Sequence, residues 1–386
     1  MATPVEPLDA IVVGAGPAGL AASRELSRAG IRHVVFERGE STGHTWTRLY
    51  DGLVLHTGKH LSTLPGMRFP TTTPLFPTRN HFLDYLDRYA KAFQLPIETR
   101  ADVTAVRWDE PGWTVALEDG RAMQARAVVI ATGIVSNPYV PKFANLTQFK
   151  GRVIHSVEYK RPEPFARERV LVVGVGNSAG EISSELAAAG ARVTVAVRSG
   201  ARVVPRDLFG VPVQYLGVAL RHVPRPWLLR TMSLVGAVAE SIRGAPPLPL
   251  PKDSACATVP LIGFHLVDAV KSGRVQLAPG VAEFVVNGVR FDDGSERWFD
   301  TVILATGYRA SLGLLGNEIT RDRCGFASRR HRVVSVDRPG LYFVGHNYDV
   351  AGGLRNIAQD ARIVARFIAN DSGRTYTGRR QRTNGR

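Results

Sequence analysis

Cysteine is scarce in this chain: Cys256 and Cys324 are the only two among 386 residues, and no C-x-x-C pair is present. Two distant cysteines are too few for a disulfide framework or a cysteine-rich metal site, so both are interpreted as packing or surface thiols. Long apolar runs are also missing. No segment offers about 18 uncharged apolar residues for a membrane span, and the first ten residues lack the pattern of a signal peptide. We therefore expect a folded, cytoplasmic protein that is neither exported nor transmembrane.

Acidic residues are in the minority, since 34 Asp and Glu face 49 Lys and Arg and leave a formal charge of +15. Such a balance favours anionic partners. Nucleic acid is not expected, because binding would need the basic residues clustered, and they are spread along the whole chain. Dinucleotide phosphates are the better candidates. The basic, polar end of the chain, residues 371–386, is expected to be disordered.

The chain contains one internal repeat, VVGAGPAGLAASRELSRAG at 12–30 and VVGVGNSAGEISSELAAAG at 172–190. Each copy reads as a buried strand, a G-x-G-x-x-G turn and an alanine-rich helix that ends at a glycine. A second strand is expected after each copy, at 32–36 and at 192–197. The repeat therefore predicts an α/β fold with two Rossmann-like dinucleotide-binding domains, although such turns can also be purely structural.

The glycines of each motif have three expected roles: the sharp turn, an open path for a pyrophosphate, and close approach of helix to sheet. In that order they are Gly14, Gly16 and Gly19 in the first copy and Gly174, Gly176 and Gly180 in the second, where Gly180 falls one position late. The helix N-terminus that follows would stabilise the phosphates with its free amide groups and partial positive charge.

The residue after the second strand separates the two predicted sites. In the first copy Glu37 can accept hydrogen bonds from ribose hydroxyls and would repel a 2′-phosphate, which favours FAD. In the second copy Arg198, Ser199 and Arg202 stand at the corresponding place, which favours NADPH. The alternative for Arg198 is an ordinary solvated arginine.

Two further segments, ARAVVIATG and FDTVILATGYR, each read as a buried strand that ends in a tight turn. They bracket the second βαβ unit and fit points where the chain leaves the first domain and returns to it. We expect an FAD domain at 1–142 and 297–370 and an inserted NADPH domain at 143–296. Within the latter, 211–251 is expected to be helical and to control substrate access, with peripheral contact to a membrane surface as the alternative.

Because the chain has no paired redox cysteines, electrons from the flavin must pass to a small molecule, either oxygen or an organic or quinone acceptor. The stretch FKGRVIHSVEYK matches the F-x-G-x-x-x-H-x-x-x-Y/F signature of flavin-containing monooxygenases, with Phe149, Gly151, His155 and Tyr159 in place. Segments before and after it, among them GHTWTRLYDGLVLHTGKHLSTLP, GVGNSAGE and ILATGYR, also resemble this family. The chain resembles class B flavin-containing monooxygenases, most closely the plant YUCCA type, which acts on indole-3-pyruvate, and its bacterial relatives.

The resemblance implies that NADPH reduces FAD, that oxygen adds at the flavin C4a atom, and that the resulting peroxyflavin oxygenates a small organic substrate. Oxidative decarboxylation of a 2-oxo acid is one outcome that it suggests. The alternative is an NADPH-dependent reductase or oxidase that acts on quinones or O2 without oxygenation.

The resemblance also suggests candidate catalytic and cofactor-binding residues. His56 and Lys59 lie in a loop that could face the flavin, and His155 is a candidate for acid–base chemistry or for organising the domain crossing, the second being favoured. Trp46 is expected near the FAD, with a plain core position as the alternative. The remaining expected cofactor contacts are Pro17, Ala18, Arg38, Thr45, Val103, Thr132, Gly133, Asn177, Ser178, Thr306, Gly307 and Tyr308. No metal is expected.

Overall fold

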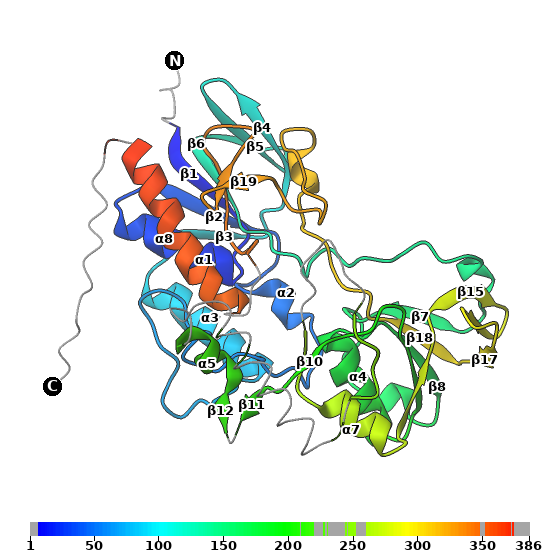
Figure 1. Cartoon of the computed structure of the whole chain (residues 1–386). Coiled ribbons are helices and arrows are strands. Elements are labelled where there is room, and N and C mark those ends of the chain that lie inside the picture. Colours follow the sequence, from blue (N-terminus) through cyan, green and yellow to red (C-terminus); the bar gives the residue numbers. More distant parts are fainter. Residues whose placement is uncertain are drawn as a thin grey trace.

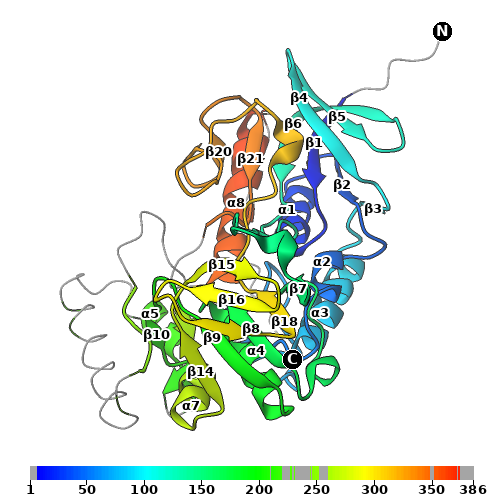
Figure 2. The same cartoon turned by 90° about the vertical axis from the view of Figure 1, so that its right-hand side faces the viewer.

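The structure is a computed structural model that describes residues 7–208, 210–219, 227, 230, 244, 246–251, 260–347, 352–371 and 373. It has two lobes, each built on a sheet with a parallel core, and the chain crosses between them (Figures 1 and 2). Most of the predicted access segment 211–251 and all but two residues of the predicted tail 371–386 lie outside the described residues.

The first lobe is organised around strand β1 (Leu8–Val13), which is parallel to both of its neighbours. The order across the sheet is β19 (Arg329–Arg330), β20 (Val334–Ser335), β21 (Leu341–Phe343), β6 (Ala122–Ile130), β1, β2 (His33–Glu37) and β3 (Ile97–Thr99). The antiparallel strands β4 (Val103–Asp109) and β5 (Gly112–Leu117) extend it from β6. Both faces of β1 are buried, which explains its unbroken apolar run.

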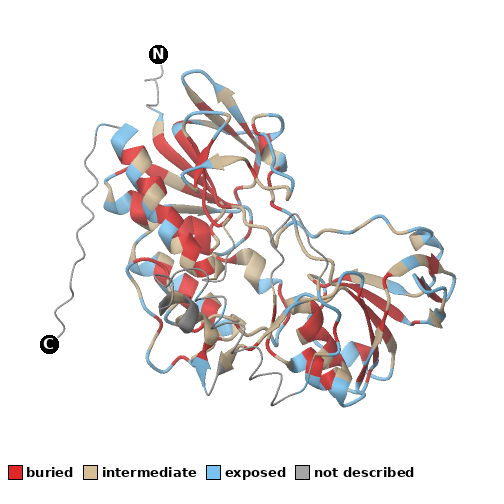
Figure 3. Ribbon diagram, viewed as in Figure 1, coloured by how far each residue is buried: buried red, intermediate tan, exposed pale blue. Residues whose placement is uncertain are grey.

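Helices cover one face of this sheet. Val12 packs with α1 (Pro17–Arg28), α3 (Arg79–Ala92) and α8 (Gly353–Asp371) in one apolar cluster. Ile11 and Val13 point the other way, into a cluster with β5 and the 3-10 turn η4 (Gly313–Leu315). In Figure 3 the buried residues accordingly fill the sheet and the helix faces against it.

The second lobe holds an all-parallel sheet. Its order is β14 (Val275–Ala278), β9 (Arg192–Ala196), β8 (Arg169–Val173), β18 (Thr301–Leu304) and β7 (Arg152–His155). One face packs against α4 (Asn177–Ala188) and α7 (His265–Lys271), and the other against the antiparallel strands β15 (Val281–Val285), β16 (Gly288–Phe291) and β17 (Glu296–Trp298). The predicted α/β fold with two Rossmann-like units is thus confirmed.

The remaining elements among the described residues are short. They are α2 (His44–Thr47), α5 (Val213–Ala219), the 3-10 turns η1 (Leu146–Gln148) and η2 (Glu163–Phe165), and the paired strands β10 (Val203–Val204) with β13 (Leu261–Ile262) and β11 (Asp207–Leu208) with β12 (Val211–Pro212).

The boundary placed at residue 297 needs correction. β18 pairs with β7 and β8, so Thr301–Leu304 belongs to the second sheet, and the chain returns to the first lobe only after Leu304. Local sequence does not decide which lobe this strand belongs to, because each sheet contains a buried strand that is followed by Ala-Thr-Gly.

The two crossing segments run side by side. The amide of Tyr139 donates to the carbonyl of Gly307 at 2.9 Å, and that of Arg309 donates to Asn137 at 2.9 Å. An isolated antiparallel bridge joins Pro138 and Tyr308 between them.

Among the described residues, no helix combines the length and apolar character that crossing a bilayer requires. Cys324 is disulfide-bonded, so its interpretation as a packing or surface thiol is wrong. The other cysteine, Cys256, lies outside the described residues.

Candidate active site

The first glycine-rich turn joins β1 to α1 at the carboxyl edge of the first sheet. Gly14 has a φ of +100°, and its amide donates to the carbonyl of Phe36 at 2.7 Å. A Cβ on Gly14 would lie 2.8 Å from the carbonyl oxygen of Ala131, and one on Gly19 would lie 1.8 Å from that of Gly14. Protein atoms alone therefore require glycine at both positions.

Gly16 is different, and it tests whether the turn fits a dinucleotide. Its backbone is extended, with φ −74° and ψ −175°, and an added Cβ would meet no protein atom within 4 Å. No side chain of the described residues caps the N-terminus of α1, which Gly16 opens. The free space and the uncapped amides of Ala18 and its neighbours are what an approaching pyrophosphate needs, so the turn fits FAD.

The second turn repeats this pattern. Gly174 has a φ of +116°, and its Cβ would lie 2.5 Å from the carbonyl oxygen of Ala305. Gly176 has φ −78° and ψ −176°, opens α4 without a side-chain cap from the described residues, and has an empty Cβ position. This turn fits a second dinucleotide for the same reason.

One glycine role is corrected. A Cβ on Gly180 would meet the side chain of Leu261, in the short strand β13, at 2.8 Å and not a strand of the parallel sheet. In the structure Ala179, third in α4 as Gly19 is third in α1, takes the place of Gly19, and it is completely buried. The late spacing of Gly180 was the sign of this difference.

Glu37 lies at the end of β2 with 7% of its surface exposed. One carboxylate oxygen accepts from the amide of Ala15 at 2.7 Å, and the other accepts from Gly39 at 2.9 Å. The carboxylate thus fixes the turn, and its remaining lone pairs can still accept ribose hydroxyls.

Several other predicted FAD contacts lie around this turn. The amide of Gly43 donates to Ala15 at 2.9 Å and so places α2, with Thr45 and Trp46, beside the turn. Trp46 also packs edge-on against Phe82, at 4.6 Å between ring centroids. Thr132 and Gly133 follow β6, and the hydroxyl of Thr132 donates to the carbonyl of Ser311 at 2.7 Å. Arg38 is exposed directly after Glu37, and Val103 is buried at the start of β4.

The predicted NADPH contacts follow β9. Arg198, Ser199 and Arg202 are exposed, and the backbone register puts them at the same edge as the second turn, because Gly174 donates to the carbonyl of Ala196 at 3.1 Å. Within the described part of the chain, neither arginine forms an ion pair. Both cations are thus available to an incoming phosphate.

Four other predicted cofactor contacts lie at the start of α4 or in the crossing. The side chain of Asn177 accepts from Ile262 at 2.7 Å and donates to the carbonyl of Pro260 at 3.2 Å. Ser178 is half-buried in the first turn of α4. The hydroxyl of Thr306 donates to the carbonyl of Tyr139, and Gly307 lies in the crossing.

His155 lies at the end of β7 and is buried. Its Nε2 lies 3.2 Å from the carbonyl of Gly307 and its Nδ1 accepts from the amide of Val157 at 3.2 Å, while its ring meets Tyr308 edge-on. Burial lowers the pKa of the imidazole below its usual value, so the ring is neutral at pH 7. Both nitrogens are satisfied within the protein, an arrangement that favours the organising role.

His56 and Lys59 lie in one loop between α2 and α3. The ammonium group of Lys59 donates to the carbonyls of Thr71, at 2.9 Å, and Thr73, at 2.5 Å, which leaves one of its three donors. His56 points instead to the other lobe, where its Nε2 lies 2.5 Å from a carboxylate oxygen of Glu181 on α4.

Sequence reasoning missed this contact between the lobes. The hydroxyl of Tyr50 adds to it by donating to Glu181, while within the second lobe the hydroxyl of Tyr159 donates to Glu185 at 3.0 Å. Burial raises the pKa of the Glu185 carboxyl, and the charge of Glu181 raises it further. Two acids four residues apart on one helix face repel each other, which was the available sign that each has a partner elsewhere.

Replacing Gly16 or Gly176 with alanine separates cofactor binding from folding. Because neither Cβ meets protein, Gly16→Ala should fold but lose most of its FAD, and Gly176→Ala should stay yellow while its KM for NADPH rises at least about tenfold. Absorbance at 450 nm measures the FAD content, circular dichroism the folding, and initial rates the KM for NADPH. Gly14→Ala is the contrasting variant, since it should fold poorly. Full flavin content in Gly16→Ala would rule out this turn as the pyrophosphate site.

Glu181→Gln removes the charge opposite His56. Both side chains are partly exposed, at 25% for His56 and 18% for Glu181, so the free energy of unfolding should fall by less than about 1 kcal/mol. Flavin reduction by NADPH should slow about tenfold at unchanged FAD content, because the contact between the loop and the helix proposed to receive NADPH is weakened. Stopped-flow absorbance measures the rate, and Glu118→Gln, an exposed acid in a turn of the first lobe, is the control. Equal reduction rates in the two variants would show that the pair has no part in reduction.

Comparison with known proteins agrees with this geometry. Residues 11–206 match the pyridine nucleotide-disulphide oxidoreductase family model. The chain is 35% identical to indole-3-pyruvate monooxygenase YUCCA1 of Oryza sativa subsp. japonica over 93% of this chain and 91% of that protein. It is 34% identical to the probable indole-3-pyruvate monooxygenase YUCCA9 of Arabidopsis thaliana, over 93% and 88%.

Among solved structures, the flavin-containing monooxygenase from Stenotrophomonas maltophilia superposes with a TM-score of 0.77 at 25% identity, over 95% of this chain and 100% of that one. The similarity to these relatives extends over both lobes. The chain is therefore an oxidoreductase that uses FAD and NADPH. The chain belongs to the class B flavin monooxygenase family.

Proposed function

We propose that this monooxygenase oxidatively decarboxylates a 2-oxo acid. The observation that carries the proposal is the similarity, over 93% of the chain, to relatives named as indole-3-pyruvate monooxygenases. In such a reaction the bond between the carboxyl and keto carbons of the substrate breaks and CO2 leaves. One atom of O2 enters the new carboxylate and the other becomes water, while NADPH supplies two electrons.

The residues have distinct proposed roles. The amides at the start of α1, with Gly16, would hold the pyrophosphate of FAD, and Glu37 would hold its ribose. The amides at the start of α4, with Gly176, would hold NADPH. Bound FAD would supply the oxygen-activating chemistry at its C4a atom.

The loop and the crossing would organise the space between the cofactors. Lys59 holds the loop to the carbonyls of Thr71 and Thr73, and His56 holds it to α4. His155, neutral and fully hydrogen-bonded, would fix the crossing without supplying a proton. Contacts of this kind would hold the reacting region in one arrangement, and the chemistry requires that region to exclude water.

Selectivity for NADPH tests the second site. In Arg198→Ala the KM for NADPH should rise by about one to two orders of magnitude, because a charge-assisted hydrogen bond to the 2′-phosphate contributes roughly 1.5–3 kcal/mol. The KM for NADH should hardly change. Arg192→Ala, at the opposite end of the same strand, removes the same charge and is the control. If Arg198→Ala raises both constants equally, the side chain does not contact that phosphate.

The reaction itself is tested with isotopes. Supplied with indole-3-pyruvate or phenylpyruvate, NADPH and ¹⁸O2, the enzyme should release CO2 and the shortened acid with one ¹⁸O atom, at one NADPH per product. Mass spectrometry and a peroxide assay measure this. A reductase or oxidase would instead consume NADPH and return hydrogen peroxide or reduced quinone without labelled acid, and that result would reject oxygenation.

A further inference from the structure

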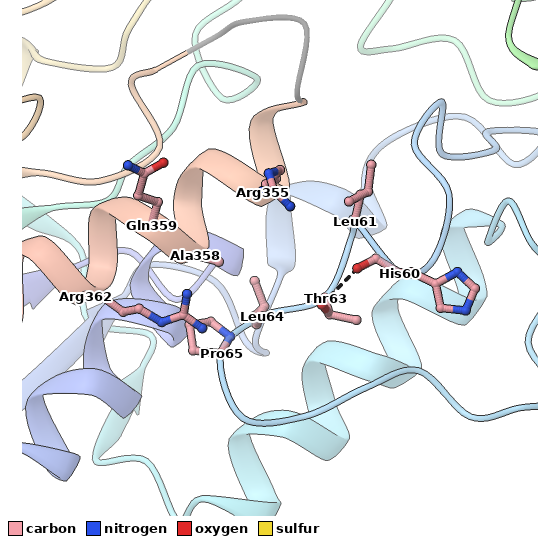
Figure 4. A pocket seen from close by; sticks show the side chains of 9 residues that line it. All are labelled: His60, Leu61, Thr63, Leu64, Pro65, Arg355, Ala358, Gln359 and Arg362. Carbon is pink, nitrogen blue, oxygen red and sulfur yellow. Dashed lines mark hydrogen bonds between the residues drawn. The ribbon is translucent and has the colours of Figure 1, made fainter. Parts of the chain in front are cut away.

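A cavity of about 420 Å³ lies between the loop at 60–65 and the exposed face of α8 (Figure 4). Its volume suits a small organic molecule. Leu61, Leu64 and Ala358 supply apolar surface, while Arg355 and Arg362 supply charge. The wall therefore combines an apolar surface with cations.

The charge of this wall has one sign. Arg355 lies in the first turn of α8 and Arg362 two turns later, about 10 Å along the axis. None of the residues that line the cavity is acidic, and neither arginine forms an ion pair within the part of the chain that the structure describes. Arg355 is half-buried and Arg362 exposed, so Arg355 is the better desolvated of the two. A guanidinium that is partly desolvated and has no carboxylate partner favours an anionic ligand.

The position of the cavity connects it to the proposed reaction. Its loop wall begins at His60, directly after Lys59. At the start of α8, a Cβ on Gly352 would lie 2.7 Å from the methyl group of Thr57, so the helix rests on the same loop. The ring of His60 points away from the other lining residues in Figure 4. Its Nδ1 is hydrogen-bonded to the hydroxyl of Tyr215 in α5 at 2.7 Å. The cavity thus lies against the loop of His56 and Lys59, which the family resemblance places near the flavin.

We propose that this cavity binds the organic acid substrate, with Arg355 as the residue that recognises its carboxylate and Leu61 and Leu64 against its apolar body. The planar guanidinium can donate two parallel hydrogen bonds to a carboxylate, which a neutral ketone cannot accept in the same way. Arg362, at the exposed end, attracts the anion but is not its anchor. The inference rests on the proposed function, because it names the site for the same class of substrate.

Two ligands that differ only in the carboxylate test the proposal. Phenylpyruvate and the neutral phenylacetone share the benzyl ketone, and their binding to the FAD-loaded enzyme without NADPH can be measured by calorimetry. Arg355→Met should raise the Kd for phenylpyruvate at least about tenfold and that for phenylacetone less than about twofold. The Kd of Arg355→Lys for phenylpyruvate should lie between those of Arg355→Met and the wild type, because lysine keeps the charge but cannot donate two parallel hydrogen bonds. Arg88→Met, an exposed arginine on α3 that does not line the cavity, is the control for net charge.

Flavin content and circular dichroism show that each variant is folded, and Leu61→Ala, at a half-buried position in the cavity wall, gives an independent readout. It should weaken both ligands alike, because it removes apolar contact only. The proposal is overturned if wild type does not bind phenylpyruvate, if Arg355→Met binds it unchanged, or if Arg355→Met weakens both ligands equally. If binding depends on Arg355 but no decarboxylated acid forms with NADPH and O2, the proposed function fails and the carboxylate site stands.

Discussion

A phosphate can reach the amide groups at the start of a helix only where no side chain stands in front of them. This condition is met twice, at Gly16 and Gly176, whose Cβ positions are empty and whose backbone conformations are almost the same. Gly14, Gly19 and Gly174, by contrast, are required by nearby backbone carbonyls of the protein itself. Empty space at these two positions is thus the feature that folding does not explain and a bound dinucleotide would. Charge at the ends of β2 and β9 would then distinguish the two nucleotides, with a carboxylate at one end and guanidinium groups at the other.

Helix α4 connects the two lobes. Its N-terminus is the proposed second phosphate site. Its fifth residue, Glu181, contacts His56 and Tyr50 of the first lobe, and its ninth, Glu185, contacts Tyr159. Two like charges one turn apart would destabilise an isolated helix. Here each carboxylate has a partner, His56 and Tyr50 for one and Tyr159 for the other. A displacement of α4 on NADPH binding would therefore also move the loop that holds His56 and Lys59, because His56 is hydrogen-bonded to Glu181 on α4.

Local pattern was sufficient to predict the repeated strand, turn and helix, because their spacing and glycines are set by neighbours in sequence. It was not sufficient for β18, since the run TVIL would be buried in either sheet and nothing local says which partner it takes. Gly180 was misassigned because a glycine near the motif spacing looks like the third glycine, whereas Ala179 fits that place without one. The pair of His56 and Glu181 joins residues 125 positions apart, beyond any periodic signal.

The crossing ties the two phosphate sites together mechanically. The carbonyl of Ala131 backs Gly14, and that of Ala305 backs Gly174. The two crossing segments follow directly after Ala131 and Ala305. They are joined by backbone hydrogen bonds at Gly307 and Asn137, and His155 adds a hydrogen bond to Gly307. The distance between the two turns is therefore set by a short chain of backbone hydrogen bonds. A histidine that is neutral and satisfied on both nitrogens suits this place, because a change in its protonation would disturb both sites at once.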